Sequence, residues 1–149
     1  MLLTGTFARA IDDKLRVAIP KRQREAFGPV EPQWLFIAPG TDGSLALYTE
    51  ETFAGLAARL AASSPHGTDV RAFNRMFYAQ AQRVELDSQG RIRIPIELAQ
   101  LAKLGKEAVL IGVQDHLELW DQASWNTYLS ERQNRYDEIA EAAFRQTIT

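Results

Sequence analysis

Two nine-residue stretches of the 149-residue chain carry side chains whose types and spacing could bind an anion. They are DDKLRVAIP at residues 12–20 and DSQGRIRIP at residues 87–95, which lie 75 residues apart. In both, Asp is followed by Arg at the fifth position and by Pro at the ninth. A guanidinium group suits phosphate oxygens or the O6/N7 edge of guanine. The spacing therefore indicates an internal repeat that presents Arg16 and Arg91 to an anionic partner.

Each stretch predicts a tight turn followed by a strand. The Asp carboxylate can accept hydrogen bonds from the backbone N–H groups two and three residues on, and Gly90 can adopt the left-handed conformation that ends a hairpin turn. Side chains alternate across a strand, so Arg91 and Arg93 share one face while the isoleucines point to the core. Two arginines side by side on one face repel each other, and a surface ion pair contributes little to offset this repulsion. Their joint presence therefore favours an anionic partner. A simple ion pair of Asp87 with Arg91 is the alternative interpretation.

The first copy of the motif, which begins at Asp12, differs at one position of its turn. Leu15 stands where the second copy has Gly90. A non-glycine residue in the left-handed region costs about 1 kcal/mol, so we expect this turn to be strained or differently shaped. Arg16 would then be aimed less reliably than Arg91.

The segments around the two turns predict the same order of elements in both halves. In the first half we expect strands at 6–11 and 16–19, a helix from Pro20, a hairpin at 34–48 and a helix at 50–62. In the second half we expect strands at 82–86 and 91–94, a helix from Pro95, a hairpin at 108–120 and a long helix from Gln122 with a break near Asn134. A Ser-, Pro- and Gly-containing linker at 62–68 precedes one more helix at 69–80.

These elements predict a mixed α+β fold, mainly a β-barrel with flanking helices. Each half is too short to enclose a stable core alone, so we expect two tandem repeats to close one barrel around a pseudo-two-fold axis. We divide the chain into a first repeat at 1–62, a linker and connecting helix at 63–80, and a second repeat with a C-terminal helix at 81–149.

The charge of the chain is unevenly distributed. The net charge is −2, which by itself argues against a nucleic-acid partner. However, residues 7–24 hold six basic residues and two acids, whereas residues 107–149 hold eight acids and three arginines. A chain with segregated charge can still present a basic face.

Composition excludes several other classes of function. The absence of Cys excludes disulfides, thiolate catalysis and zinc-cysteine sites, and neither His66 nor His116 has a partner at ligand spacing on a helix. No nucleophile and base are arranged for catalysis, so we expect no enzyme activity, metal, cofactor or small-molecule substrate. No apolar stretch approaches the roughly 20 residues that a membrane span needs, and we expect a cytoplasmic protein.

The two turn stretches, together with ELAQLAKLGKEAVLIGVQDHLELWD at 97–121, resemble the MraZ family of bacterial transcription regulators, within the AbrB-like swapped-hairpin class. The likeness spans nearly the whole chain. The family's hallmark is Asp-x-x-x-Arg in each half, usually with Lys-Gly before the Arg. In this sequence it matches Asp12, Lys14 and Arg16 in the first half, and Asp87, Gly90 and Arg91 in the second. Leu15 departs from the usual Gly, and Gln89 departs from the commoner Lys.

The resemblance implies two AbrB-like repeats in one barrel, assembled into a ring that binds short direct repeats in the promoter ahead of the division and cell wall gene cluster. The chain would repress that cluster, and its partners would be double-stranded promoter DNA and further copies of itself at the nucleoid. The expected DNA contacts are Arg16, Arg91, Lys14, Arg93, Gln89 and Arg9. An AbrB-type antitoxin-like module that binds a partner protein is the alternative.

Overall fold

The computed structural model describes residues 1–63 and 67–148, and it confirms the mixed α+β class. The first half contains β1 (Thr6–Ala10), β2 (Arg16–Ala18), α1 (Lys21–Ala26), β3 (Trp34–Pro39), β4 (Leu45–Tyr48) and α2 (Glu50–Ser63). After α3 (Thr68–Gln80) come β5 (Gln82–Glu85), β6 (Arg91–Arg93), α4 (Ile96–Leu101), β7 (Glu107–Gly112) and β8 (Leu117–Asp121). The middle of the predicted linker, with His66, lies outside the described residues.

Six strands form one antiparallel sheet in the order β1-β7-β8-β4-β3-β5, and β2 pairs with β6 in a separate two-stranded ribbon. The sheet is open, with β1 and β5 at its edges, so the predicted closed barrel is wrong. The ribbon lies beside both edges, with β2 next to β1 and β6 next to β5. Because β2 and β6 are three residues long and form their ladder with each other, they do not join the edges of the sheet.

The order of the sheet is unchanged when the corresponding strands of the two halves are exchanged, β1 with β5, β3 with β7 and β4 with β8. β4 and β8 pair at the centre, and each forms a hairpin with the strand before it. The outer pairings cross between the halves, because β1 of the first half pairs with β7 and β5 of the second half pairs with β3. Neither half therefore completes its part of the sheet alone.

The ribbon is anchored by a buried apolar inner face. Val17 and Ile92 lie opposite each other and are fully buried, and Ile19 and Ile94 continue the same face into the main core. Two residues after each strand comes a proline with φ of −56°, Pro20 before α1 and Pro95 before α4. The apolar positions of the repeated motif therefore fix the ribbon to the body of the protein.

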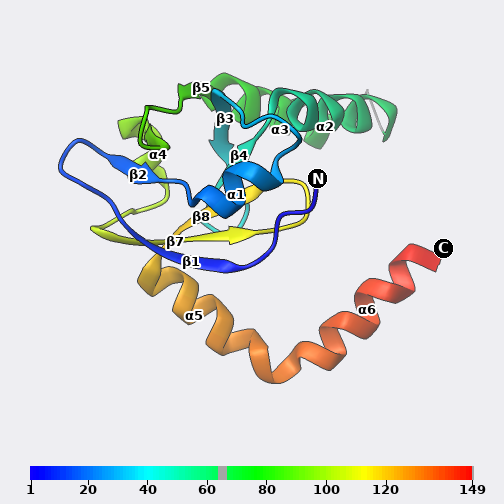
Figure 1. Cartoon of the computed structure of the whole chain (residues 1–149). Coiled ribbons are helices and arrows are strands. Elements are labelled where there is room, and N and C mark those ends of the chain that lie inside the picture. Colours follow the sequence, from blue (N-terminus) through cyan, green and yellow to red (C-terminus); the bar gives the residue numbers. More distant parts are fainter. Residues whose placement is uncertain (64–66, 149) are drawn as a thin grey trace.

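The longer helices lie on different sides of the strands (Figure 1). α2 and α3 pack against β3 and β4, where Phe53 stacks on Phe36 and on Phe77 with ring centroids 4.4 and 5.6 Å apart. α5 (Gln122–Arg132) packs against β7 and β8, where Trp125 contacts the buried Trp120 with ring centroids 5.2 Å apart. These two aromatic clusters attach the helices to the sheet.

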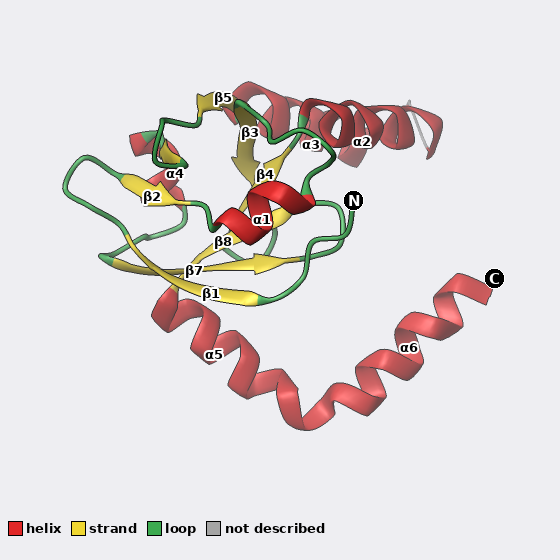
Figure 2. Ribbon diagram, in the orientation of Figure 1, coloured by secondary structure: helices red, strands yellow, loops and turns green. Residues whose placement is uncertain are grey.

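The C-terminal segment forms an arm that leaves the body of the protein (Figure 2). As predicted, the long helix breaks near Asn134, at the short 3-10 helix η1 (Gln133–Arg135), and continues as α6 (Tyr136–Ile148). Tyr136 and Phe144 on α6 are each 70% exposed. None of the described helices is long and apolar enough to span a bilayer.

His116 connects the β7–β8 hairpin to the adjacent strand β4. Its Nδ1 lies 2.8 Å from Asp115 Oδ1 and its Nε2 lies 3.4 Å from Glu118 Oε2. The ring stacks on Tyr48, with centroids 5.2 Å apart. The hydrogen bond to Glu118 is the main cause that raises the pKa of His116, and burial opposes it. Folding therefore favours the protonated ring more than the unfolded chain does.

We expect the pKa shift of His116 to make stability depend on pH. A raised pKa in the folded state contributes stability that is complete below the unfolded value of 6.5 and is lost as the pH rises through the folded value. Urea unfolding should therefore give a larger free energy of unfolding at pH 6 than at pH 8, and His116→Gln should reduce this difference. An unchanged difference in the variant would contradict the assignment to His116.

Candidate nucleic-acid interface

The two turns of the repeated motif have the same hydrogen bonds. Asp12 Oδ1 accepts from the backbone N–H groups of Lys14 and Arg16, each at 2.9 Å. Asp87 Oδ1 accepts at 2.9 Å from the corresponding N–H groups of Gln89 and Arg91. The donors are two and four residues after the Asp, rather than two and three as the sequence suggested. The N–H three residues on donates to the carbonyl oxygen of the Asp instead.

Each Asp also orients the arginine of its own turn. Arg16 Nε donates to Asp12 Oδ2 at 2.7 Å, and Arg91 Nε donates to Asp87 Oδ2 at 2.9 Å. The backbone N–H of the arginine is the main cause that lowers the pKa of each carboxyl, so both stay ionised at neutral pH. The ion pair considered as an alternative interpretation is thus present, but it uses only the Nε side of each guanidinium.

The terminal nitrogens of Arg16 and Arg91 remain available for a ligand. Within the described part of the chain, their guanidinium groups bond only to Asp12 and Asp87, through Nε. The side chains of Arg16 and Arg91 are 33% and 28% exposed. Each turn therefore fixes the Nε atom of a guanidinium group and leaves its two terminal nitrogens accessible.

Leu15 and Gly90 adopt the same left-handed conformation, with φ of 59° and 76°. The first turn is therefore not differently shaped, and its hydrogen bonds aim Arg16 as well as those of the second turn aim Arg91. Leu15 packs against the main core, and its carbonyl accepts from Ile94 N at 2.8 Å. Packing of the side chain offsets the conformational cost that the sequence predicts.

The ribbon brings a third arginine beside the two turns. Arg16 lies directly opposite Arg93 in the ladder, and Arg91 lies opposite Ala18. The three arginines share the outer face, because the residues between them in sequence are buried. Like charges placed directly opposite each other destabilise a strand pair. Asp12 and Asp87 offset part of this repulsion, whereas Arg93 has no carboxylate partner among the described residues.

The remaining predicted contacts are placed differently. Lys14 and Gln89 occupy corresponding exposed positions in the two turns. Arg93 Nε donates to the carbonyl oxygen of Lys14 at 3.0 Å, which links the second half to the first turn. Arg9 lies outside both turns, on the edge strand β1, where Nη1 donates to Ala8 O and the buried Nε has no partner in the described chain. The structure thus groups five of the six predicted residues and sets Arg9 apart.

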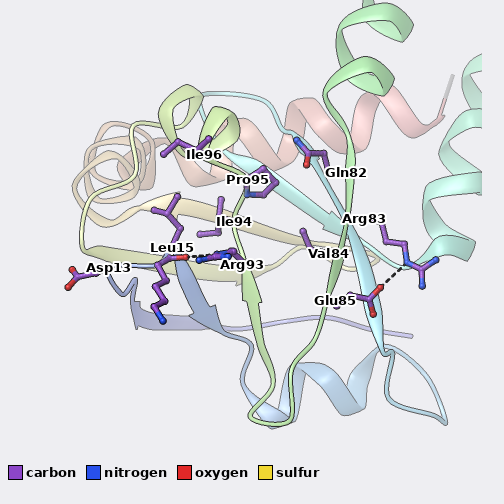
Figure 3. Close-up of a pocket in the computed structure, with 11 residues that line it drawn as sticks. Asp13, Leu15, Gln82, Arg83, Val84, Glu85, Arg93, Ile94, Pro95 and Ile96 are labelled. Carbon is purple, nitrogen blue, oxygen red and sulfur yellow. Dashed lines mark hydrogen bonds and ion pairs between the residues drawn. The ribbon is translucent and has the colours of Figure 1, made fainter.

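An open pocket of about 620 Å³ adjoins the first turn (Figure 3). Lys14, Leu15 and Arg93 line one part of it, and Gln82 to Glu85 of β5 line another. Arg83 Nε bonds to Glu85 Oε1 at 3.3 Å across its edge. Among the described residues, no group of three or more His, Asp or Glu side chains is placed to hold a metal ion.

Arg24 also lies in this region, although it is not among the six DNA contacts expected from the sequence. It belongs to α1, yet its guanidinium lies against Gly90 of the second turn, where a Cβ would lie 2.7 Å from Nε. The sequence contains one signal that could have drawn attention to Arg24. The two halves are offset by 75 residues, and the position that corresponds to Arg24 in the second half holds the small residue Ala99.

Comparison of this sequence with known proteins shows which family the chain belongs to. The protein named Transcriptional regulator MraZ of Alkaliphilus oremlandii is 39% identical over 139 residues, which cover 93% of this chain and 94% of that protein. The chain belongs to the MraZ family. The family model described as "MraZ protein, putative antitoxin-like" matches residues 77–147, which include the second turn.

Other MraZ relatives match over similar lengths. The Transcriptional regulator MraZ of Limosilactobacillus reuteri (strain DSM 20016) is 40% identical over 140 residues, 94% of this chain and 96% of that protein. The protein of the same name from Lactiplantibacillus plantarum is 40% identical over 137 residues, 92% of this chain and 94% of that protein. Matches of this length span both halves of the chain.

Substitutions at Leu15 separate its conformation from its packing. We expect Leu15→Ala to lower the free energy of unfolding more than Leu15→Gly, by up to about 1 kcal/mol, because only glycine relieves the left-handed strain while both lose the packing. Urea unfolding at pH 7 measures both changes. If the alanine variant is as stable as the glycine variant, the turn does not require a left-handed residue at this position.

Proposed function

We propose that this member of the MraZ family is a sequence-specific DNA-binding transcriptional repressor that contacts promoter DNA with the β2–β6 ribbon. The observation that carries the proposal is the outer face of the ribbon, where Arg16, Arg91 and Arg93 lie together. The curated relatives are named transcriptional regulators, which supports the same class of function. The proposal assigns the chain no catalytic activity, cofactor or small-molecule substrate.

The geometry of the ribbon suits the major groove of DNA. A two-stranded β-ribbon fits that groove, and a guanidinium group can donate two hydrogen bonds to one guanine. Arg16 and Arg91 are held at Nε by Asp12 and Asp87, so their terminal nitrogens point a fixed pair of donors outward. The exposed Lys14 and Gln89 flank them and are suited to phosphate or base edges. The net charge of −2 does not oppose this contact, because Lys14, Arg16, Arg91 and Arg93 lie together at the ribbon.

We further propose that the two halves, 1–62 and 81–149, are AbrB-like repeats joined by residues 63–80. The exchange of corresponding strands that leaves the sheet order unchanged supports this division. So do the matching hydrogen bonds of the two turns. In this proposal one ribbon combines one turn from each repeat into a single DNA-contacting unit.

Several copies of the chain would assemble into a ring on short direct repeats, in the promoter ahead of the division and cell wall gene cluster and at the nucleoid. A head-to-tail ring presents successive subunits to DNA in one orientation, whereas a two-fold dimer requires a palindrome. The α6 arm supports assembly, because Tyr136 and Ile139 are exposed on one apolar side and α6 contacts little of its own chain besides η1. Exposed apolar stripes of this kind mark interaction surfaces.

A second candidate function is an antitoxin-like module that binds a partner protein. The description of the matching family contains the word antitoxin-like, and the exposed α6 arm offers an apolar surface to a protein. In that case the ribbon arginines would be dispensable and promoter DNA would not be distinguished from other DNA.

Arginine substitutions test the DNA-binding proposal. We expect Arg16→Ala and Arg91→Ala each to weaken binding to the chain's own upstream region by about 1–3 kcal/mol, and by similar amounts because the two turns have the same geometry. Fluorescence anisotropy at two salt concentrations, against a scrambled fragment of equal length, measures both affinity and preference. Arg59→Ala on α2 is the matched control. Equal binding of both fragments by the unaltered chain would contradict the proposal.

A charge placed on the α6 arm tests assembly. Ile139→Asp should lower the molar mass measured by light scattering, because the apolar side of α6 would then carry a charge into any contact between copies. Glu141→Lys, on the opposite side of the same helix, should leave the mass unchanged. A mass that does not respond to Ile139→Asp would mean that α6 does not hold the oligomer together.

A further inference from the structure

The second turn rests on an arginine of the first half. Arg24 Nε donates to Ile19 O at 3.1 Å, and Nη1 donates to Glu31 Oε2 at 3.1 Å. Its guanidinium is thus held at both ends, and the side chain is 22% exposed. The space for a side chain at Gly90 is filled by this group, because a Cβ there would lie 2.7 Å from Nε and 2.8 Å from Cζ of Arg24.

The first turn has the opposite arrangement of sizes. Its turn residue is the large Leu15, and the helix position that corresponds to Arg24 is the small Ala99. Leu15 packs against the main core cluster, which includes Ala99. Each turn is therefore combined with one large and one small residue, Gly90 with Arg24 in one case and Leu15 with Ala99 in the other.

The first turn also has an arginine brace from the other half of the chain. Arg93 Nε donates to Lys14 O at 3.0 Å, across 79 residues of sequence. Its counterpart in the first half is Ala18, which has no donor to offer to the second turn. The backbone crosses in the same way, because Ile19 N donates to Gly90 O and Ile94 N donates to Leu15 O.

We infer that Arg24 and Arg93 are positioning residues, each of which holds the DNA-contacting turn of the opposite half. Arg24 holds the turn that carries Arg91, and Arg93 holds the turn that carries Arg16. This inference rests on the proposed function. The two turns have the same shape, but a different arginine supports each of them. A contact to a base edge needs its donors placed within about 0.5 Å. Loss of Arg24 therefore reduces affinity without removing a contact, whereas loss of Arg93 removes a brace and also a side chain of the outer face.

Stability tests the brace at the second turn without DNA. Gly90→Leu should lower the melting temperature strongly, because leucine is strained at a φ of 76° and its side chain also meets the guanidinium of Arg24. Adding Arg24→Ala to Gly90→Leu recreates the combination of Leu15 with Ala99, so the double variant should recover part of that loss. If the double variant loses the sum of the two single losses, Arg24 does not support the turn.

Affinity for the promoter fragment tests the crossed pattern. Arg24→Ala should weaken binding, and combined with Arg91→Ala it should add little further loss, whereas combined with Arg16→Ala the two fold-changes should multiply. Arg93→Ala should show the reverse coupling: combined with Arg16→Ala it should lose less than the product of the two fold-changes, whereas with Arg91→Ala the two should multiply. The departure from multiplication should be about threefold or more in the coupled pairs.

A second readout separates positioning from a direct contact or a general loss of stability. Hydrogen exchange of the free protein should become faster at the amides of Gln89 and Arg91 in Arg24→Ala, and at the amides of Lys14 and Arg16 in Arg93→Ala. Multiplication in all four pairs with unchanged exchange would overturn the inference. Failure of the unaltered chain to prefer its promoter would instead overturn the proposed function, and the exchange and stability results would still decide the brace.

Discussion

A single carboxylate organises each of the two turns on which the ribbon depends. One oxygen of Asp12 holds two backbone N–H groups, and the other holds the Nε of Arg16. Asp87 does the same for the second turn. Because the charge is tied to the backbone and to the arginine at once, the turn and the direction of the guanidinium are set together. The terminal guanidinium nitrogens of Arg16 and Arg91 take no part in this network. They lie on the outer face of the ribbon.

The ribbon combines an apolar inner face with a cationic outer face. Val17 and Ile92 are fully buried between the two strands and the core, so the strands cannot move apart to relieve repulsion between their arginines. Arg16 and Arg93 remain opposite each other at a cost in stability. Burial of the isoleucines and valine therefore keeps the positive charges close together on the outer face of the ribbon.

The local features of this ribbon could be predicted from the sequence, and the long-range ones could not. Alternation gave the outward arginines and the inward isoleucines, and the motif gave the role of the Asp residues in the turns. The open sheet was not foreseen, because pairing of β1 with β7 and of β3 with β5 joins distant segments and leaves no periodic signal. The contact of Arg24 with Gly90 was missed for the same reason, because it also joins distant segments. The sequence showed only that Arg24 corresponds to the small residue Ala99 in the second half.

We propose that DNA binds at the two Asp-anchored turns. Hydrogen exchange of the chain with and without its own promoter fragment is the sharpest test of this proposal, because the readout covers every segment at once. We expect slower exchange at residues 12–16 and 87–91 when DNA is bound, with α2 and α3 unchanged. Protection confined to α2, α3 or α6, with both turns unaffected, would show that DNA binds elsewhere.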